Sequence, residues 1–226
     1  MKRVLLSLLL VLPLVRPGFA QAPVAIAPDQ PWAEFLGPFP KADSDDGKAD
    51  LAIVLWHQRT RTAPEVERAL SEVKLGLGAY STALGRAGDG ARFPRTAALL
   101  DLAGKDVKAV TDELKQHFQR PRPYAADPRV QPAVERETSP SYPSGHATRG
   151  LVYALVLAEL APERRDALLV RGRQVGVDRV IGGVHYPSDI EAGQRLALKL
   201  ASEWLAKPQN RALLEAVRAA EWSSKP

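Results

Sequence analysis

The sequence predicts an all-α protein whose main part is a single helical-bundle domain. Apolar residues recur at three- and four-residue spacing through most of the chain, and no stretch alternates apolar and polar residues as a β-strand does. The 226 residues are 45% hydrophobic and 25% charged, a globular composition that excludes a disordered or fibrous chain. Because cysteine is absent, disulfides, thiolate metal ligands and a cysteine nucleophile are excluded too.

The N-terminal part of the chain precedes this domain. A basic start, an apolar run from Val4 to Val15 and small residues up to Ala20 are typical of a secretory signal peptide. Residues 1–20 are therefore expected to be cleaved and the protein to be periplasmic, with an uncleaved anchor or a buried helix as the alternative. Prolines then predict an extended arm over residues 21–44. No later segment reaches 18 unbroken apolar residues, so no stable membrane insertion is expected after cleavage.

The helices of the domain, residues 45–226, are expected where the three- and four-residue spacing is strongest. Pro64 and Pro94 fit these helices because a first helical turn tolerates proline, and Ser188 with Glu191 forms the pattern of a capping box. A proline-rich stretch over residues 121–143 predicts a loop. The expected helices are Asp50–Arg59, Ala63–Leu77, Pro94–Gly104 continued by Lys105–Phe118, Ala147–Leu160, Pro162–Val177, Ser188–Ala206 and Asn210–Trp222.

The first cluster with chemical potential is Lys115 followed by Arg122. Lys115 lies near the end of an expected helix and Arg122 in the loop after it, so both can converge on one anion. The alternative is a solvated basic helix end that complements the helix dipole.

The second cluster is Tyr142–His146, directly before an expected helix. Ser144 suits the N-cap position, Gly145 lets the backbone approach a ligand closely, and the free amide groups of a helix start attract an anion. His146 would then lie beside that anion. The alternative is a plain cap with an incidental histidine.

The third cluster is Arg179, His185 and Asp189. The four-residue spacing places Asp189 alongside His185 if both lie in the first turn of a helix. A carboxylate on one ring nitrogen fixes the tautomer and leaves the other nitrogen as a nucleophile or base. A structural His–Asp pair is the alternative. Of the remaining histidines, His57 is interpreted as structural, and His117 is left outside the site.

Taken in order, these clusters resemble the signature of the type 2 phosphatidic acid phosphatase superfamily. That signature is Lys, six residues and Arg-Pro, then Pro-Ser-Gly-His, then Ser-Arg, five residues, His, three residues and Asp. The surroundings, such as Ser141–His146 and Val180–His185, are similar to those of the bacterial class A non-specific acid phosphatases. The likeness is clear over roughly residues 101–220. The matching residues are Lys115, Arg122-Pro123, Pro143–His146, Arg179, His185 and Asp189.

The resemblance implies a helical bundle of the acid phosphatase and vanadium haloperoxidase type. It implies a metal-independent, broad-specificity acid phosphatase that hydrolyses small phosphomonoesters without a cofactor through a phosphohistidine intermediate. His185, oriented by Asp189, would attack phosphorus, and His146 would protonate the leaving alcohol, which predicts a bell-shaped pH profile on the acid side. The implied phosphate-binding residues are Lys115, Arg122, Ser144, Gly145 and Arg179.

One residue departs from the family pattern. Asp178 stands where the signature has serine before its arginine. A carboxylate at this position can hold the guanidinium of Arg179 in place, or it can repel a bound anion and weaken its binding.

Four alternative functions stay open on the sequence. Two of them share the superfamily: a vanadate-dependent haloperoxidase and a lipid-phosphate phosphatase. The third is a non-catalytic phosphate binder, which would need the cations but not the His–Asp pair. The fourth, a metal-dependent phosphatase, finds no His-Glu-x-x-His or comparable ligand spacing in the chain.

The net charge does not indicate a nucleic-acid partner. The formal charge of +5 comes from 31 basic and 26 acidic residues, and Lys2, Arg3 and Arg16 belong to the expected signal segment. Without these three, 28 basic residues remain against the same 26 acidic ones, so no nucleic-acid binding is expected. Helical domains often pair through apolar faces, and a homo-oligomer therefore stays open.

Overall fold

The computed structural model describes residues 31–223, so the expected signal peptide lies outside the described residues. The described residues form helices and turns without any strand, which confirms the predicted all-α, single-domain fold. Short 3₁₀ turns lie between several of the helices, and a π-helical turn follows the last one. The α-helices are α1 (Trp32–Leu36), α2 (Asp45–Thr60), α3 (Ala63–Ser71), α4 (Ser81–Leu84), α5 (Pro94–Phe118), α6 (Pro123–Ala126), α7 (Gly145–Leu160), α8 (Arg165–Ile181), α9 (Pro187–Ala206) and α10 (Pro208–Val217).

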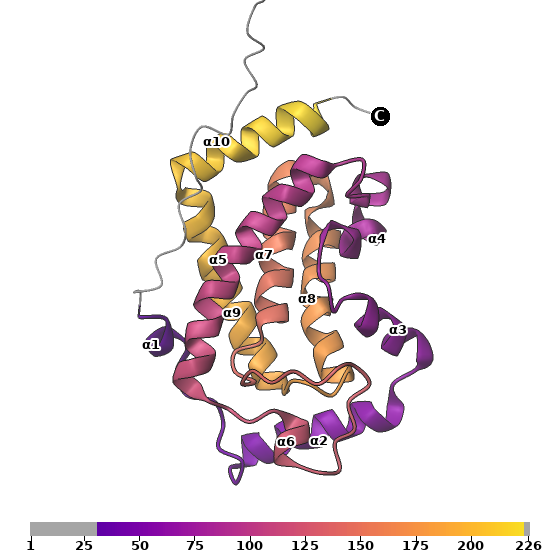
Figure 1. The fold of residues 1–226 in the computed structure, drawn as a ribbon, viewed down its shortest axis with the longest axis vertical. Coiled ribbons are helices and arrows are strands. Elements are labelled where there is room, and N and C mark those ends of the chain that lie inside the picture. The colour runs from indigo at the N-terminus through magenta and orange to yellow at the C-terminus, as the bar shows by residue number, and fades with distance from the viewer. Residues whose placement is uncertain (1–30, 224–226) are drawn as a thin grey trace, which may run out of the picture.

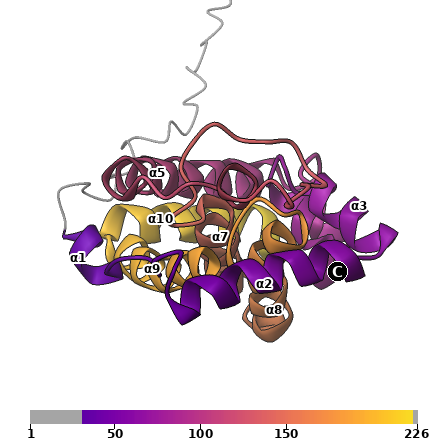
Figure 2. The same cartoon turned by 90° about the horizontal axis from the view of Figure 1, so that it is seen from below.

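Four long helices, α5, α7, α8 and α9, lie side by side and form the bundle (Figure 1). α7 is central because it packs against each of the other three, and Figure 2 shows α5 and α8 on opposite sides of it. Most of the α7 side chains are apolar and buried, as expected for a helix that is covered on all sides. The helix α2 and the single turn α6 lie across the lower end of the bundle in Figure 1.

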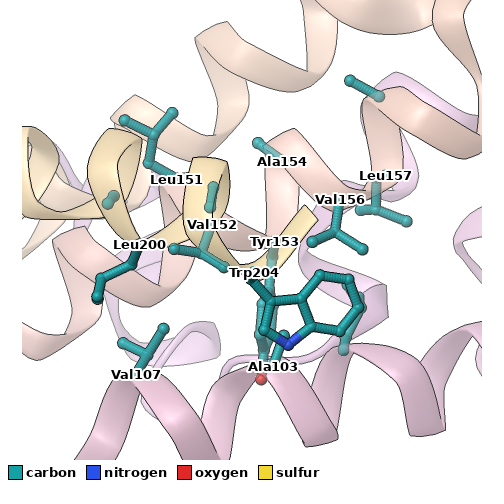
Figure 3. Close-up of a cluster of buried hydrophobic side chains, with 14 of the residues drawn as sticks. Ala103, Val107, Leu151, Val152, Tyr153, Ala154, Val156, Leu157, Leu200 and Trp204 are labelled. Atoms are coloured by element: carbon teal, nitrogen blue, oxygen red, sulfur yellow. The ribbon is translucent and has the colours of Figure 1, made fainter. Parts of the chain in front are cut away.

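The core joins side chains from α5, α7 and α9 in one cluster (Figure 3). Trp204 of α9 lies among Ala103 of α5 and Val156 and Leu157 of α7, and all four are almost fully buried. Burial of apolar side chains is the main stabilising contribution in such a bundle. The cluster therefore fixes the positions of the helices whose ends carry the predicted site.

Two glycines allow α7 and α8 to approach each other closely. A Cβ atom at Gly172 would stand 2.6 Å from the Cβ of Ala154, and one at Gly150 would stand 2.8 Å from the Cβ of Val175. These separations are shorter than carbon atoms tolerate, so larger residues would force the helices apart. This contact holds the start of α7 and the end of α8 in a fixed relation.

Helix boundaries differ from the prediction where local hydrogen bonds decide them. α2 begins at Asp45 rather than Asp50, because the Ser44 side chain accepts a hydrogen bond from the Gly47 amide at 3.1 Å. α3 ends at Ser71, and residues 77–88 form the short helix α4 with a 3₁₀ turn on each side of it. α8 begins at Arg165, after a 3₁₀ turn, and continues to Ile181.

The predicted capping box at the start of α9 is wrong in its residues. The N-cap is Tyr186, whose amide donates to Asp189 Oδ2 at 2.9 Å, so Asp189 takes the role expected of Glu191. The side chain of Ser188 instead donates to Asp50 of α2. α9 therefore begins one residue earlier than predicted, and Asp189 lies in its first turn.

The described part of the expected proline-rich arm contains a short helix. Of residues 21–44 the structure describes 31–44, and these include the helix α1. Trp32 and Leu36 of α1 are buried in the core cluster. This segment therefore belongs to the packed domain.

Candidate active site

Four helix ends and one turn bring seven of the eight predicted site residues to the same end of the bundle, and Arg122 joins them from the position directly before α6. Prolines and left-handed residues set these ends: Gln119 (φ 51°) terminates α5, and Gly183 (φ 76°) permits the tight turn between α8 and α9. A Cβ atom at Gly183 would also lie 3.2 Å from the backbone of Pro132. The carriers are the end of α5 for Lys115, the start of α7 for Ser144, Gly145 and His146, the end of α8 for Arg179, the α8–α9 turn for His185, and the start of α9 for Asp189.

A pocket of about 220 Å³ opens at this end between α5 and α7. Its volume suits a small polar ligand. Of the predicted residues, Lys115, Gly145, His146 and His185 line it directly. The full lining is Gly104, Val107, Lys108, Thr111, Asp112, Lys115, Glu137, Ser139, Gly145, His146, Arg149 and His185.

His185 is held in one tautomer by its two neighbours. Its Nδ1 lies 3.1 Å from Asp189 Oδ2, and its Nε2 lies 3.1 Å from Nη1 of Arg122. A guanidinium can only donate and a carboxylate only accept, so Nδ1 carries the proton and Nε2 holds the lone pair. Burial, with the charges of Arg122 and Lys115, lowers the pKa of His185 well below its ordinary value, so the ring is neutral. An unprotonated Nε2 therefore faces the cations.

A buried polar shell fixes Asp189 from behind. Ser141 Oγ donates to Asp189 Oδ2, and Arg120 Nη1 donates to Oδ1 at 2.6 Å. Arg120 also donates through Nη2 to Asp50 of α2 at 2.8 Å, and Asp50 in turn accepts the Ser188 amide at 3.0 Å. Arg120 and its two carboxylate partners are buried, where charge-assisted hydrogen bonds are strong. The imidazole of His185 is thus oriented by a network that reaches α2.

Arg122 and Arg179 meet on a single carboxylate that sequence reasoning missed. Arg122 Nη2 lies 2.7 Å from Glu137 Oε2, and Arg179 Nη2 lies 3.2 Å from Glu137 Oε1. Nε and Nη1 of the buried Arg179 have no hydrogen-bond partner within residues 31–223. Free donors on a buried guanidinium are the groups that an anion would satisfy. Glu137 thus lies between the pocket and the two arginines that were predicted to bind phosphate.

Lys115 adds a third cation to this end of the pocket. Its buried ammonium group donates to the carbonyl oxygen of Pro140. Burial, with the charge of Arg122, lowers the pKa of Lys115 to about 8, so the group is charged in acid and neutral solution. Three buried cations around one neutral imidazole form a strongly positive environment.

His146 lies in the pocket wall, in the first turn of α7. Its Nε2 lies 3.3 Å from the carbonyl oxygen of Val73, an acceptor. Burial, with the charges of Arg179 and Arg149, lowers the pKa of His146 to about 3. Ser144 is fully buried, and its side chain caps α7 by accepting the Ala147 amide at 3.3 Å. The expected capping role of Ser144 is therefore present, while it does not line the pocket.

Asp178 neither supports Arg179 nor faces the pocket. Its buried carboxylate accepts two hydrogen bonds from Arg68 of α3, at 2.7 and 2.8 Å, and one from Gln174 at 2.9 Å. Arg171 lies 3.8 Å away. Asp178, the residue that departs from the family signature, thus connects α8 to α3.

Among the pocket residues that were not predicted, Thr111 and Arg149 could have been found from helical spacing in the sequence, whereas Glu137 could not. Thr111 lies four residues before Lys115 on α5, and Arg149 lies three residues after His146 on α7. Residues at this spacing share one face of a helix, so the spacing from the motif residues was a signal for both. Glu137 lies in the proline-rich loop, where no periodicity applies. Its place is set by tertiary contacts, including a hydrogen bond from the Tyr124 hydroxyl to its carbonyl oxygen at 2.6 Å.

Two features are absent from residues 31–223: a cluster of metal ligands and a helix that could span a membrane. No group of three or more His, Asp or Glu side chains there has the arrangement of a metal site. None of the helices in the described part of the chain combines the length and apolar character needed to cross a membrane.

The fold and the site together define a helical bundle with a His–Asp pair and clustered cations at one end. The family model of the PAP2 superfamily matches residues 98–212 of the chain. This range includes each of the predicted site residues. The chain belongs to the PAP2 superfamily, as its motifs indicated.

Named relatives agree with this assignment. The chain is 35% identical over 122 residues to an acid phosphatase of Zymomonas mobilis subsp. mobilis, covering 52% of this chain and 46% of the relative. It is 32% identical over 171 residues to a non-specific acid phosphatase of Providencia stuartii, covering 72% and 69%. The chain thus spans about half the length of the first relative and about two thirds of the second.

A solved structure shares the fold. The crystal structure of a bacterial vanadium-dependent iodoperoxidase superposes with a TM-score of 0.56 at 19% identity, over 76% of this chain and 52% of that one. At this identity the likeness establishes the architecture alone. The helical bundle predicted from the motif resemblance is therefore confirmed.

Proposed function

We propose that the protein is an acid phosphatase that hydrolyses small phosphomonoesters by a metal-independent route through a phosphohistidine intermediate. The observation that carries the proposal is the lone pair of His185 Nε2, which the Asp189 contact fixes and which faces the guanidinium of Arg122. A non-catalytic phosphate binder would need the cations but not an oriented nucleophile. Membership of the PAP2 superfamily supports the phosphatase class.

The first chemical step uses His185 as the nucleophile. Its Nε2 lone pair forms the N–P bond as the P–O bond to the alcohol breaks in line, and His146 delivers a proton to the departing oxygen. Lys115, Arg122 and Arg179 hold the phosphoryl oxygens, with the Gly145 amide and the Ser144 hydroxyl proposed beside them. Positioned cations supply the charge stabilisation on which phosphoryl transfer depends.

The second step returns the enzyme to its starting state. His146, now neutral, takes a proton from a water molecule whose oxygen attacks phosphorus, and the N–P bond breaks with its electrons returning to His185 Nε2. Inorganic phosphate leaves. The low pKa of His146 rises when a dianion binds beside it, because negative charge favours the imidazolium. The substrate thus helps to protonate the acid that it needs.

The proposed location is the periplasm. Support comes from the basic start and the apolar run within residues 1–20.

The alternative function of a vanadate-dependent haloperoxidase is supported by the shared fold alone.

The direct test is hydrolysis of 4-nitrophenyl phosphate by the purified protein at pH 5–6. Activity is expected to persist after exhaustive treatment with a chelator, because protein cations provide the charge stabilisation, and orthovanadate is expected to inhibit it competitively. Activity that disappears with the chelator and returns with added Mg²⁺ or Zn²⁺ would contradict the metal-free route. Bromide or iodide oxidation by the vanadate-loaded protein with peroxide would favour the haloperoxidase instead.

Replacement of Glu137 by glutamine is expected to strengthen phosphate binding and lower KM about three- to tenfold. The Glu137 carboxylate is paired with Arg122 and Arg179, so an entering phosphoryl group must displace it. Glutamine keeps the shape and removes the charge. The measurement is the inhibition constant of inorganic phosphate together with KM for 4-nitrophenyl phosphate.

The matched control is Glu135→Gln, which removes an exposed carboxylate from the same loop. This variant is expected to behave as the wild type. An E137Q protein with unchanged or weaker phosphate binding would show that Glu137 does not compete with the substrate.

A further inference from the structure

One cation that lines the pocket, Arg149, has no role in the proposed reaction. Arg149 lines the pocket from α7, three residues beyond His146, and is partly buried. Its guanidinium forms no hydrogen bond or ion pair with any residue in the range 31–223, and its Nε is a buried donor without a partner. We propose that Arg149 anchors a second anion subsite, and that the enzyme prefers phosphomonoesters whose leaving group carries a second phosphate-like anion. This proposal rests on the phosphatase function proposed above.

The position of Arg149 along the pocket indicates that it would contact the leaving group of the substrate. The α5 wall runs from Lys115 at the phosphoryl end to Gly104, and 11 residues of helix span about 16 Å. Gly104 marks the far end, where the Tyr153 hydroxyl would lie 2.3 Å from a Cβ atom. Side chains three apart on a helix lie about 5–6 Å from each other, so Arg149 follows His146 away from His185. The group that His146 protonates therefore leaves toward Arg149.

The charges of the pocket single out Arg149. Glu137 neutralises part of the charge of Arg122 and Arg179, and Lys108 is paired with Asp112 on the exposed rim. Among the described residues, no carboxylate lies within hydrogen-bonding distance of Arg149, whose charge nevertheless lowers the pKa of His146. An arginine cannot lose its proton in a protein, and a partly buried cation without a counterion gains strongly from an entering anion. The leaving-group region thus selects negative charge.

The geometry also limits the spacing between the two anions. The phosphoryl group lies at His185 and Lys115, and the second anion would lie about one helical turn or more from the oxygen that His146 protonates. Two phosphates on adjacent atoms would not reach both places. Compounds in which a short carbon chain separates the two anionic groups fit the pocket, and alkyl bisphosphates are the simplest of them.

The test compares two non-hydrolysable ligands by calorimetry, propylphosphonate and 1,3-propylenebisphosphonate, on wild type, Arg149→Gln and Arg173→Gln. Wild type is expected to bind the bisphosphonate about tenfold more tightly, the gain that one charge-assisted pair provides. R149Q is expected to lose most of this ratio. R173Q, which removes an exposed charge from α8, should retain it. Turnover of 1,3-propanediol bisphosphate against 3-hydroxypropyl phosphate should follow the same pattern.

The outcomes separate this proposal from the function on which it rests. A wild type that binds both ligands equally, or an R149Q protein that keeps the wild-type ratio, would overturn the subsite even if phosphatase activity is high. Binding of both ligands without any turnover would overturn the phosphatase, while the ratios would still decide the subsite. A folded wild type that binds neither ligand would overturn both.

Discussion

Replacement of His185 by alanine is expected to reduce kcat for 4-nitrophenyl phosphate by more than about 10⁴-fold, because the residue forms the covalent intermediate in the proposed mechanism. The three cations Lys115, Arg122 and Arg179 stay in place in this variant. Phosphate and vanadate binding should therefore remain measurable, which separates loss of chemistry from loss of the site. The measurements are steady-state kinetics and calorimetric titration with inorganic phosphate.

A matched histidine serves as the control for this experiment. His57 lies on α2, where its ring packs edge-on against Trp56 with 4.8 Å between centroids, and it is not among the pocket residues. His57→Gln should leave kcat within about twofold of the wild type, the usual outcome for a substitution away from the reacting groups. Substantial turnover by a folded H185A protein would eliminate the phosphohistidine route.

Replacement of Arg120 by alanine is expected to lower the free energy of unfolding by about 3–5 kcal/mol. The guanidinium is buried between Asp50 and Asp189, so its removal leaves two buried carboxylates without their shared partner. It also lies over the ring of Tyr186, 4.1 Å from the centroid, and that stacking is lost too. Urea denaturation followed by circular dichroism provides the measurement.

Arg195 offers a comparison in a similar but exposed arrangement. Its guanidinium lies 5.7 Å from the ring centroid of Phe35 and donates to the Phe35 carbonyl oxygen at 3.0 Å. Arg195→Ala should cost less than about 1 kcal/mol, as exposed pairs generally do. Arg120→Lys should recover part of the stability but less of the activity, since a single ammonium cannot reproduce the fork that orients Asp189. An R120A protein as stable as the wild type would show that the network makes no net contribution to the free energy of unfolding.

The fold was predictable because the helices bury one face or more, and burial leaves a three- and four-residue spacing in the sequence. The end of α5 and the start of α7 were predictable for a second reason. Lys115 and Ser144 belong to ordered motifs, and backbone requirements at helix ends restrict which residues fit there. The family match bears out the resemblance drawn from those motifs.

What could not be predicted depends on contacts between distant parts of the chain. Glu137 reaches Arg179 across 42 residues, and Asp50 reaches Arg120 across 70. Neither acidic residue belongs to a motif, and each would suit a solvated surface equally well. The α9 cap was assigned to the wrong residues for a related reason, since Ser188 is drawn to Asp50. A local sequence pattern reveals only the hydrogen-bond partners that lie within a few residues of a side chain. Competition from a distant partner, such as Asp50 for Ser188, leaves no such pattern.

The polar network that reaches α2 and α3 has a consequence for where the functional unit ends. The recognised family region spans residues 98–212, yet Asp50 and Arg68, which lie before it, neutralise buried charges of Arg120 and Asp178 inside it. A fragment cut to the family boundaries would leave Arg120 with Asp189 as its one remaining carboxylate partner, and Asp178 without the bidentate pair from Arg68. Grafting this catalytic module onto another scaffold therefore requires the two early helices as well, because the unit that folds is larger than the unit that sequence similarity detects.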